Sequence, residues 1–390
     1  HLTCPAIYGG EHMVKLTPVM GWNAWNWFGG NVSEQLLCEI ADAMVSSGLA
    51  DCGYEYIIVD DGWSLKTRDK KGRLVPDPAK FPNGIQAVTD YIHGRGLKFG
   101  MYSCAGNLTC AGYPGSFEHE FVDADTFASW GVDYLKYDYC YHSKIIPGKY
   151  LYRRMGIALE NCGRDILFHA CSWGADQTHE WIKETAASMW RSGADIYDNW
   201  ATVVSLAEHQ APLHPYNGVG CFNDMDMLIV GLEGKSPISL GGCSYTQYKT
   251  HFSLWAFFAS PLIISCDIRR MSPETKNILT HRELIAINQD RACRQLVRLE
   301  GVMWTGADPL CYYKQLENGD IAIGLFNLRD ETCTARFNLD ELGLPYSTGK
   351  TLEMRELWTG ERVRVENAAV SWTLEACGCA VFRCKVVDAG

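Results

Sequence analysis

The segment "GVDYLKYDYC", residues 131–140, has the composition of a buried strand but ends in charged side chains. Its apolar and aromatic residues favour a strand that is covered on both faces. Lys136 and Asp138 stand two positions apart, and a pleated strand directs such residues to the same face. A cation and an anion at the end of a buried strand indicate a functional site.

The same pattern, a glycine before a short apolar run, recurs along the chain. It precedes "YEYIIVDDGW" at Gly53, "LKFGMYSC" at Gly96 and "RDILFHACSW" at Gly163. Amphipathic segments lie between these runs, and residues 33–47 are the clearest of them, with Ser33 as the N-cap and Gly48 as the C-cap of a helix. The repeating unit is therefore a helix, a glycine cap, a parallel strand and a loop.

Eight such units predict a TIM barrel, an α/β fold with eight parallel strands. The strands are expected at residues 17–21, 54–60, 97–103, 132–138, 166–171, 187–191, 219–223 and 262–266. The last helix is expected near residues 274–286. A doubly wound sheet is the alternative, but no glycine-rich dinucleotide turn follows the first strand, so we favour the closed barrel.

After residue 292 the texture changes to alternating strands such as "DIAIGLFNL" and "GCAVFRCKV". The turn "ENGD", centred on Asn318 and Gly319, predicts a β-hairpin. We therefore expect a catalytic barrel over residues 13–292 and an antiparallel β-sandwich domain over residues 293–390. Residues 1–12 lack periodicity and are interpreted as an appended or flexible N-terminus.

Charge and composition narrow the partners. The net charge of −11 argues against nucleic acid and anionic membranes, so a neutral substrate is expected. No run resembles a membrane span or a signal peptide, which favours a cytoplasmic location unless a leader was removed. The 17 cysteines form neither a zinc pattern nor a secreted disulfide framework. A homo-oligomer is possible on these grounds but nothing argues for it.

Polar residues gather where the predicted strands end, which is where TIM barrels carry their active sites. The second strand ends in Asp60 and Asp61, the fourth in Lys136 and Asp138, and the sixth in Arg191. A lone aspartate there is more often a helix cap than a catalytic group, but several strand ends in one barrel favour a shared site.

Carboxylates and tryptophans together predict a sugar site, because acids bind hydroxyls and indoles stack on sugar rings. Lys136 would favour the ionised form of Asp138, which suits a nucleophile. A metal is not expected: barrel metal hydrolases usually carry His-x-His after the first strand, where this chain has "MGWNAW". We expect neither a metal nor an organic cofactor.

Taken in order, these motifs resemble family 27 of the glycoside hydrolases, the α-galactosidase and α-N-acetylgalactosaminidase family. The resemblance covers roughly residues 16–290. It rests on "MGWNAW", "VDDGW", "GNLTCAGYPGS", "LKYDYC", "CSWG", "MWRSGAD", "NDMDML" and "SPETKNILTHRELIAINQD".

The resemblance implies a retaining mechanism in which Asp138 is the nucleophile and Asp195 is the general acid and later the base. It also implies a disulfide between Cys110 and Cys140 near the site. The substrate-binding residues that it implies are Trp25, Asp60, Asp61, Lys136, Cys140, Ser172, Ala175, Arg191, Asp226 and Met227.

Sugar specificity is expected to depend on Ser172, within "CSWG", and on Ala175, the residue that follows this motif. Galactose-specific members usually have a long acid or amide where this chain has Ser172, and Ser172 with Ala175 is similar to the small pair of the N-acetylgalactosaminidases. Small side chains leave room for a 2-acetamido group, so the main hypothesis is removal of terminal α-linked N-acetylgalactosamine.

Two other functions stay open. One is an α-galactosidase that acts on terminal α-galactosides. The other is a sugar-binding barrel without turnover, because Cys104 stands where the family usually has an aspartate. Asp176, which replaces an expected aromatic residue in the loop of Ser172 and Ala175, counts against the preference for N-acetylgalactosamine.

Overall fold

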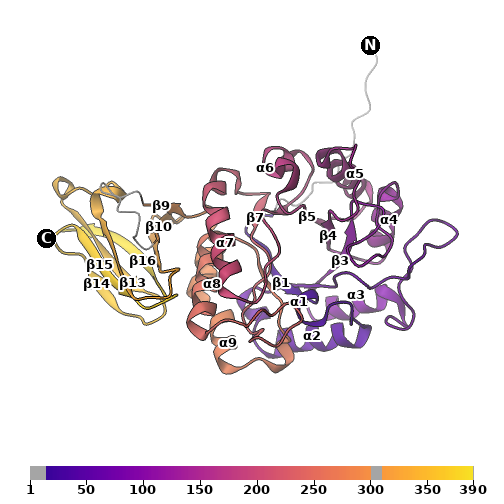
Figure 1. Cartoon of the computed structure of the whole chain (residues 1–390), viewed down its shortest axis with the longest axis horizontal. Coiled ribbons are helices and arrows are strands. Elements are labelled where there is room, and N and C mark those ends of the chain that lie inside the picture. Colours follow the sequence, from indigo (N-terminus) through magenta and orange to yellow (C-terminus); the bar gives the residue numbers. More distant parts are fainter. Residues whose placement is uncertain (1–14, 300–309, 390) are drawn as a thin grey trace, which may run out of the picture. The chain divides into compact units, whose positions relative to one another are not determined.

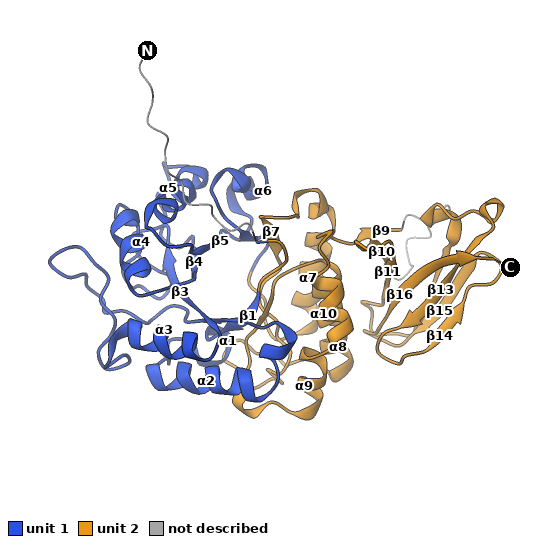
Figure 2. Ribbon diagram, turned by 180° about the vertical axis from the view of Figure 1, so that it is seen from behind, with its two compact units in different colours: residues 1–15, 20–194 blue, residues 16–19, 195–390 orange. Residues whose placement is uncertain are grey.

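The computed structural model describes residues 15–299 and 310–389. The predicted N-terminal segment 1–12 therefore lies outside the described residues. Contacts divide the chain into two compact units, residues 1–15 with 20–194 and residues 16–19 with 195–390 (Figure 2). The boundary expected at residue 292 stays a prediction.

Eight parallel strands form one sheet in the order β7-β6-β5-β4-β3-β2-β1-β8. Every strand lies beside its neighbour in sequence, and β8 lies beside β1, so the order never reverses. Leu228, just after β7, also forms a parallel bridge with Ile264 of β8. A doubly wound sheet would reverse its strand order, so the predicted TIM barrel is confirmed and the alternative is wrong.

Unit 1 contains the first six strands and the helices between them (Figure 2). The strands are β1 (Met20–Asn23), β2 (Tyr56–Ile58), β3 (Lys98–Cys104), β4 (Tyr134–Asp138), β5 (Leu167–Cys171) and β6 (Met189–Arg191). The helices are α1 (Trp25–Phe28), α2 (Glu34–Ser46), α3 (Gly84–Gly94), α4 (Glu120–Ser129), α5 (Gly148–Asn161) and α6 (Thr178–Trp181).

The helix α2 begins after Ser33 as its sequence predicts, but its C-cap is Ser47, and the expected cap Gly48 follows it with a left-handed φ of 83°. The Ser33 hydroxyl accepts a hydrogen bond from the Leu36 N–H at 3.2 Å, which satisfies one of the free donors of the first turn. Leu37, Ile40 and Met44 are fully buried on one face. The amphipathic stripe therefore covers the barrel, and α2 packs beside α3 (Figure 1).

The register of β4 brings polar side chains together at the carboxyl end of the sheet. Asp138 lies opposite Cys104 on β3 and Cys171 on β5. Lys136, two residues earlier, lies opposite Tyr102 and His169. Strand pairing thus places the charged residues of "LKYDYC" beside residues from both neighbouring strands.

The barrel part of unit 2 contains β7 (Phe222–Asp224), β8 (Leu262–Ile264), α7 (Trp200–Gln210), α8 (Tyr245–Phe257), α9 (Pro273–Leu279) and α10 (Arg282–Asn288). The single helix expected near residues 274–286 is wrong, since the chain forms two helices there. His281 starts the second, and its Nδ1 accepts the Leu284 N–H at 3.3 Å. Across the described ranges, no helix combines the length and apolar character that a membrane crossing needs.

The C-terminal residues of unit 2 form two antiparallel sheets, as predicted. Their strands are β9 (Val297–Arg298), β10 (Leu310–Gln315), β11 (Ile321–Phe326), β12 (Cys333–Asn338), β13 (Lys350–Glu356), β14 (Arg362–Arg364), β15 (Ala369–Leu374) and β16 (Cys379–Asp388). Six strands pair in the order β14-β13-β16-β11-β10-β9, and β12 pairs with β15. Gly319, with a φ of 86°, turns the predicted hairpin between β10 and β11. Ile323, Phe337 and Phe382 belong to the core of this β-sandwich.

Candidate active site

Lys136 forms a buried ion pair with Asp60 from the loop after β2. Its Nζ lies 2.7 Å from the Asp60 Oδ2, which also accepts the Asn23 amide at 2.8 Å. Burial lowers the pKa of Lys136, but the neighbouring groups Asp60, Cys171 and Asp138 together outweigh burial and raise this pKa above its usual value. The direct partner of Lys136 is thus Asp60.

Two hydrogen-bond donors hold the Asp138 carboxylate. The Tyr102 hydroxyl donates to Oδ2 at 2.9 Å, and the Tyr139 N–H donates to Oδ1 at 2.9 Å. Burial raises the pKa of Asp138 above its usual value, while the charge of Lys136 and these two donors oppose that shift. Lys136 therefore does favour the ionised carboxylate, but it does not overcome burial.

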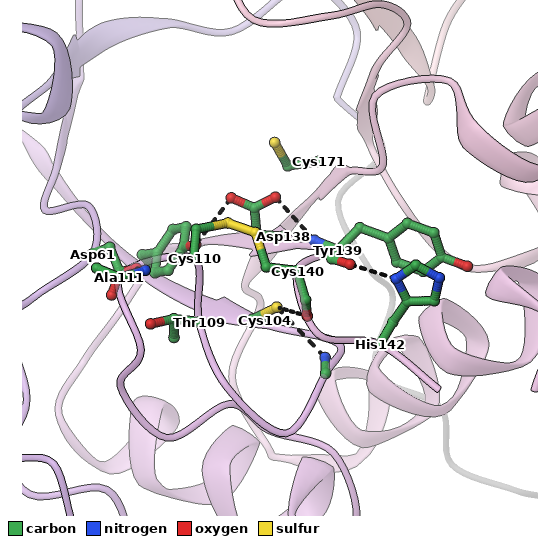
Figure 3. The surroundings of a disulfide bond; sticks show 12 residues. Asp61, Cys104, Thr109, Cys110, Ala111, Asp138, Tyr139, Cys140, His142 and Cys171 are labelled. Carbon is green, nitrogen blue, oxygen red and sulfur yellow. Dashed lines mark hydrogen bonds between the residues drawn. A yellow bond between two sulfur atoms is a disulfide. The ribbon is translucent and has the colours of Figure 1, made fainter. Parts of the chain in front are cut away.

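A disulfide joins Cys110 and Cys140 beside Asp138 (Figure 3), as the family resemblance implied. Both sulfur atoms and a carboxylate oxygen of Asp138 lie within 4.8 Å of one another. The main chain approaches closely here, because a β carbon on Gly106 would come within 2.1 Å of the Cys140 carbonyl oxygen. The disulfide loop thus forms one wall beside the carboxylate.

Cys104, the residue that replaces an expected acid, lies under the same wall (Figure 3). Its thiol donates to the Cys140 carbonyl oxygen at 3.0 Å. Burial raises the pKa of the Cys104 thiol far above its usual value, so it stays neutral. Cys104 therefore supports the loop that the disulfide closes and leaves the Asp138 carboxylate without a second buried charge from this position.

Asp61 is held by the loop that contains the disulfide. Its Oδ1 accepts the Gly62 N–H at 2.7 Å and its Oδ2 accepts the Ala111 N–H at 2.8 Å. Ala111 directly follows Cys110, so the N–H that binds Asp61 belongs to the residue next to the disulfide. Burial raises the pKa of Asp61, and the Ala111 N–H opposes this shift.

The loop after β5 differs from the expectation based on Ser172. Ser172 has no exposed surface, and its hydroxyl lies 2.9 Å from the Thr178 hydroxyl. Ala175 is half-buried, and its carbonyl oxygen accepts the Thr178 hydroxyl. A buried serine with an internal partner does not present its hydroxyl to a 2-acetamido group, so this geometry gives the expected contact no support.

Arg191 ends β6 and is buried. Its Nη2 donates to the carbonyl oxygens of Ala194 at 2.8 Å and Gly193 at 3.2 Å. These contacts shape the turn that leads to Asp195, which is exposed and begins the long segment of unit 2.

Asp226, from the loop after β7, supports the residue next to Asp195. Its Oδ2 accepts the Ile196 N–H at 2.8 Å, and its Oδ1 accepts the Met227 N–H at 2.8 Å. Asp226 is buried and has a left-handed φ of 84°, which is uncommon for a residue other than glycine. Met227 is buried beside it. The structure thus gives Asp226 a positioning contact that its sequence did not predict.

The tryptophans divide between core and surface. Trp22 is fully buried, and Trp63 is buried with its Nε1 donating to the Tyr102 carbonyl oxygen at 2.9 Å. Trp25 and Trp173 are half-buried. Trp25 and Trp173 therefore keep surface that a sugar ring could contact.

Two residues around Asp138 were missed by the sequence analysis. Tyr102 was not singled out, although its position two residues before the end of β3 was a usable signal. Tyr139 follows the candidate nucleophile directly, but nothing in the sequence indicated that its N–H binds the carboxylate.

Comparisons with known proteins agree over nearly the whole chain. A family model described as "Alpha galactosidase A" matches residues 17–290, and one described as "Alpha galactosidase C-terminal beta sandwich domain" matches residues 307–384. Alpha-galactosidase 3 of Arabidopsis thaliana is 42% identical over 364 residues, which cover 91% of this chain and 78% of the relative.

Solved structures give the same result. The chain matches α-galactosidase I from Mortierella vinacea with a TM-score of 0.89 and 33% identity, covering 96% of this chain and 98% of the other. It matches the Saccharomyces cerevisiae α-galactosidase, solved with raffinose, with a TM-score of 0.84 and 31% identity, covering 95% and 98%. The relatives compared here are named as α-galactosidases, so the preference for N-acetylgalactosamine expected from Ser172 and Ala175 is not supported.

Proposed function

The chain belongs to the α-galactosidase family, family 27 of the glycoside hydrolases, and we propose from this membership that it removes terminal α-linked galactose from its carbohydrate substrate. The names of the relatives support galactose as the sugar. The burial of Ser172 also supports it, since the feature that favoured N-acetylgalactosamine is not displayed.

The observation that carries the chemistry is the arrangement around Asp138. A nucleophile must be ionised and fixed in direction, and two donors from Tyr102 and Tyr139 hold one oxygen each. Lys136 adds a positive charge on the same strand. Asp138 is therefore the group proposed to attack the anomeric carbon.

The reaction proceeds in two steps. Asp138 displaces the leaving group and forms a covalent glycosyl ester, while Asp195 donates a proton to the glycosidic oxygen. Asp195 then removes a proton from water, which attacks the ester and regenerates Asp138. A retaining enzyme of this kind needs its two carboxyl groups about 5–5.5 Å apart, and we expect Asp138 and Asp195 to have that separation.

The buried polar groups beside Asp138 are proposed to bind the sugar hydroxyls. Asp60 and Lys136 form one ion pair at the carboxyl end of the sheet, and Asp61, the residue after Asp60, is held by the disulfide loop. Charged partners make hydrogen bonds to neutral hydroxyls stronger than neutral partners do. The exposed face of Trp25 is proposed to contact an apolar face of the ring.

The test compares hydrolysis of nitrophenyl α-galactoside with that of nitrophenyl α-N-acetylgalactosaminide by the same preparation. We expect a kcat/KM at least about tenfold higher on the galactoside, since one misfitting substituent costs about 1–3 kcal/mol. The Asp138→Ala variant is the control, and azide should restore part of its turnover because a small anion can replace the carboxylate. Faster cleavage of the N-acetylated substrate would reverse the assignment, and sugar binding without any turnover would indicate an inactive barrel.

A further inference from the structure

A short hydrogen bond joins the loops that follow β4 and β5. The Tyr139 hydroxyl donates to the Asp176 Oδ2 at 2.5 Å. Burial, and then the Asp176 carboxylate, raise the pKa of Tyr139 well above its usual value, so the phenol keeps its proton and acts as the donor. Hydrogen bonds to a charged acceptor are worth about 1.5–3 kcal/mol, more than those between neutral groups.

Contacts hold both the side chain and the main chain of Tyr139. Its ring is 1% exposed and stacks on His142 with ring centres 3.7 Å apart and planes 5° from parallel (Figure 3). Its carbonyl oxygen lies 2.6 Å from the His142 Nδ1. Its N–H holds the Asp138 Oδ1 at 2.9 Å. The side chain anchored by Asp176 and the N–H bound to Asp138 thus belong to one residue.

The surrounding backbone is built around this contact. A β carbon on Gly148 would lie 2.6 Å from the Tyr139 hydroxyl and 3.2 Å from the Asp176 Oδ2, so only glycine leaves room for the pair. Asp176 and Gln177 both have left-handed φ values, 52° and 53°. Trp181 donates from its Nε1 to the Asp176 carbonyl oxygen at 2.8 Å. Strained residues of this kind persist when the neighbouring contacts hold them.

We propose that Asp176 is a positioning residue for the nucleophile: by fixing the Tyr139 side chain, it fixes the peptide N–H that orients the Asp138 carboxylate. The inference rests on the proposed function for the identity of the nucleophile. It gives a role to the acid that replaces an expected aromatic residue in this loop. If the carboxylate rotates away from its line of attack, the rate of the reaction falls steeply, because a misplacement of about 1 Å can lower the rate about 100-fold.

The test measures steady-state kinetics of Tyr139→Phe and Asp176→Ala on nitrophenyl α-galactoside. We expect kcat to fall about 10-fold to 100-fold while KM changes less than about threefold, because geometry and not sugar binding is lost. Asp176→Asn keeps an acceptor oxygen and should retain most of the activity. The double variant should be no worse than either single variant, since both remove one shared contact.

The pH profile separates positioning from stability alone. The Tyr139 N–H stabilises the ionised form of Asp138, so a misplaced N–H should raise the pKa of Asp138 and move the acid limb of kcat/KM to higher pH. Tyr91→Phe is the matched control, because the Tyr91 hydroxyl donates to the Asp42 Oδ2 at 2.9 Å on the exposed surface of α3. It removes a similar hydrogen bond and should leave both kcat and the pH profile unchanged.

A wild-type kcat and pH profile in Tyr139→Phe, with only a lower Tm, would show a structural role and overturn the inference. The proposed function fails separately, if wild-type protein cleaves the N-acetylgalactosaminide instead; the variants are then compared on that substrate. A crystal structure of Asp176→Ala tests the inference without any measurement of turnover. Loss of the hydrogen bond between the Tyr139 nitrogen and the Asp138 Oδ1 would support the inference, and an unchanged bond would refute it.

Discussion

At the scale of single residues, the ionised form of Asp138, which the chemistry needs, makes folding less favourable. Desolvation disfavours its charged form, and Tyr102, Tyr139 and Lys136 recover only part of that free energy, so its pKa remains raised. A raised carboxyl pKa means that ionisation is harder in the folded protein than in the unfolded chain. The ionised nucleophile therefore destabilises the fold.

Asp138→Asn should abolish turnover and raise Tm at neutral pH, by roughly 2 °C for each kcal/mol recovered in a chain of this size. The sign follows from linkage: the destabilisation is present above the folded pKa, decreases as pH falls, and vanishes below the ordinary pKa of the unfolded chain. Thermal unfolding of both proteins across pH 4–8 checks this.

Asp42→Asn is the control for that measurement. The Arg95 guanidinium lowers the pKa of Asp42, so its substitution should give no gain in Tm at neutral pH. A lower Tm for Asp138→Asn at every pH would contradict the argument about Asp138.

At the scale of elements, the sequence predicted what repeats and missed what depends on contacts between strands. Glycine before an apolar run located β2, β3, β4 and β5, and short apolar runs located the other four strands, because burial and capping act locally. The break before His281 was missed because no proline or glycine marks it. Lys136 and Asp138 share a face, but two strand residues span about 6.6 Å, so a partner from another strand can lie closer.

The positions of the candidate acids in the fold were predicted for the same reason. Acidic residues at strand ends can be recognised from their position in the sequence, and Asp60, Asp61 and Asp138 do lie at the carboxyl ends of β2 and β4. Ser172 was misleading because its spacing in the chain does not show whether its hydroxyl faces a ligand or Thr178. Tyr102 was missed because an aromatic residue in an apolar strand is most often core.

The disulfide loop after β3 supplies a prediction for an element. Replacing Cys110 and Cys140 by serine should raise KM for the galactoside more than it lowers kcat, because Ala111 then holds Asp61 less firmly. Stability should also fall, by about 2–4 kcal/mol. Kinetics and thermal unfolding with and without dithiothreitol measure both effects.

Reduction of the wild-type disulfide should reproduce the double variant, and the double variant should be insensitive to dithiothreitol. Cys38→Ser is the control, since Cys38 is a free, half-buried thiol on α2. A wild-type KM that survives complete reduction, confirmed by counting thiols, would refute the link between the disulfide and Asp61.

At the scale of the whole molecule, α8 connects the barrel part of unit 2 to the β-sandwich. All residues from His251 to Phe257 are buried, so the helix has no solvent face there. Trp255 donates to the Asp226 carbonyl oxygen at 2.7 Å on one side. Thr250 donates to the Cys377 carbonyl oxygen at 2.8 Å on the other. The helix α8 therefore contacts both the barrel part of unit 2 and the β-sandwich.

Lys314 makes the same connection from the sandwich. Its ammonium is buried and donates to the Ile287 carbonyl oxygen at 2.9 Å, near the C-terminus of α10, where a cation is favoured. Burial nevertheless lowers the pKa of Lys314 to about 7. Through Lys314 the sandwich therefore packs against α8 and α10 within unit 2.

A chain that ends at residue 292 should therefore fail to fold stably, because α8 and α10 would lose their cover. We expect insoluble protein or a soluble form that binds a hydrophobic dye and unfolds without a cooperative transition. The full chain should lose its helices and its sandwich in one transition by circular dichroism and fluorescence. Arg355→Ala is the control, since it removes only the half-exposed ion pair with Glu283 and should cost at most about 1 kcal/mol. If the truncated chain unfolds cooperatively within about 5 °C of the full protein, a difference worth only about 1–2 kcal/mol, α8 does not need the sandwich.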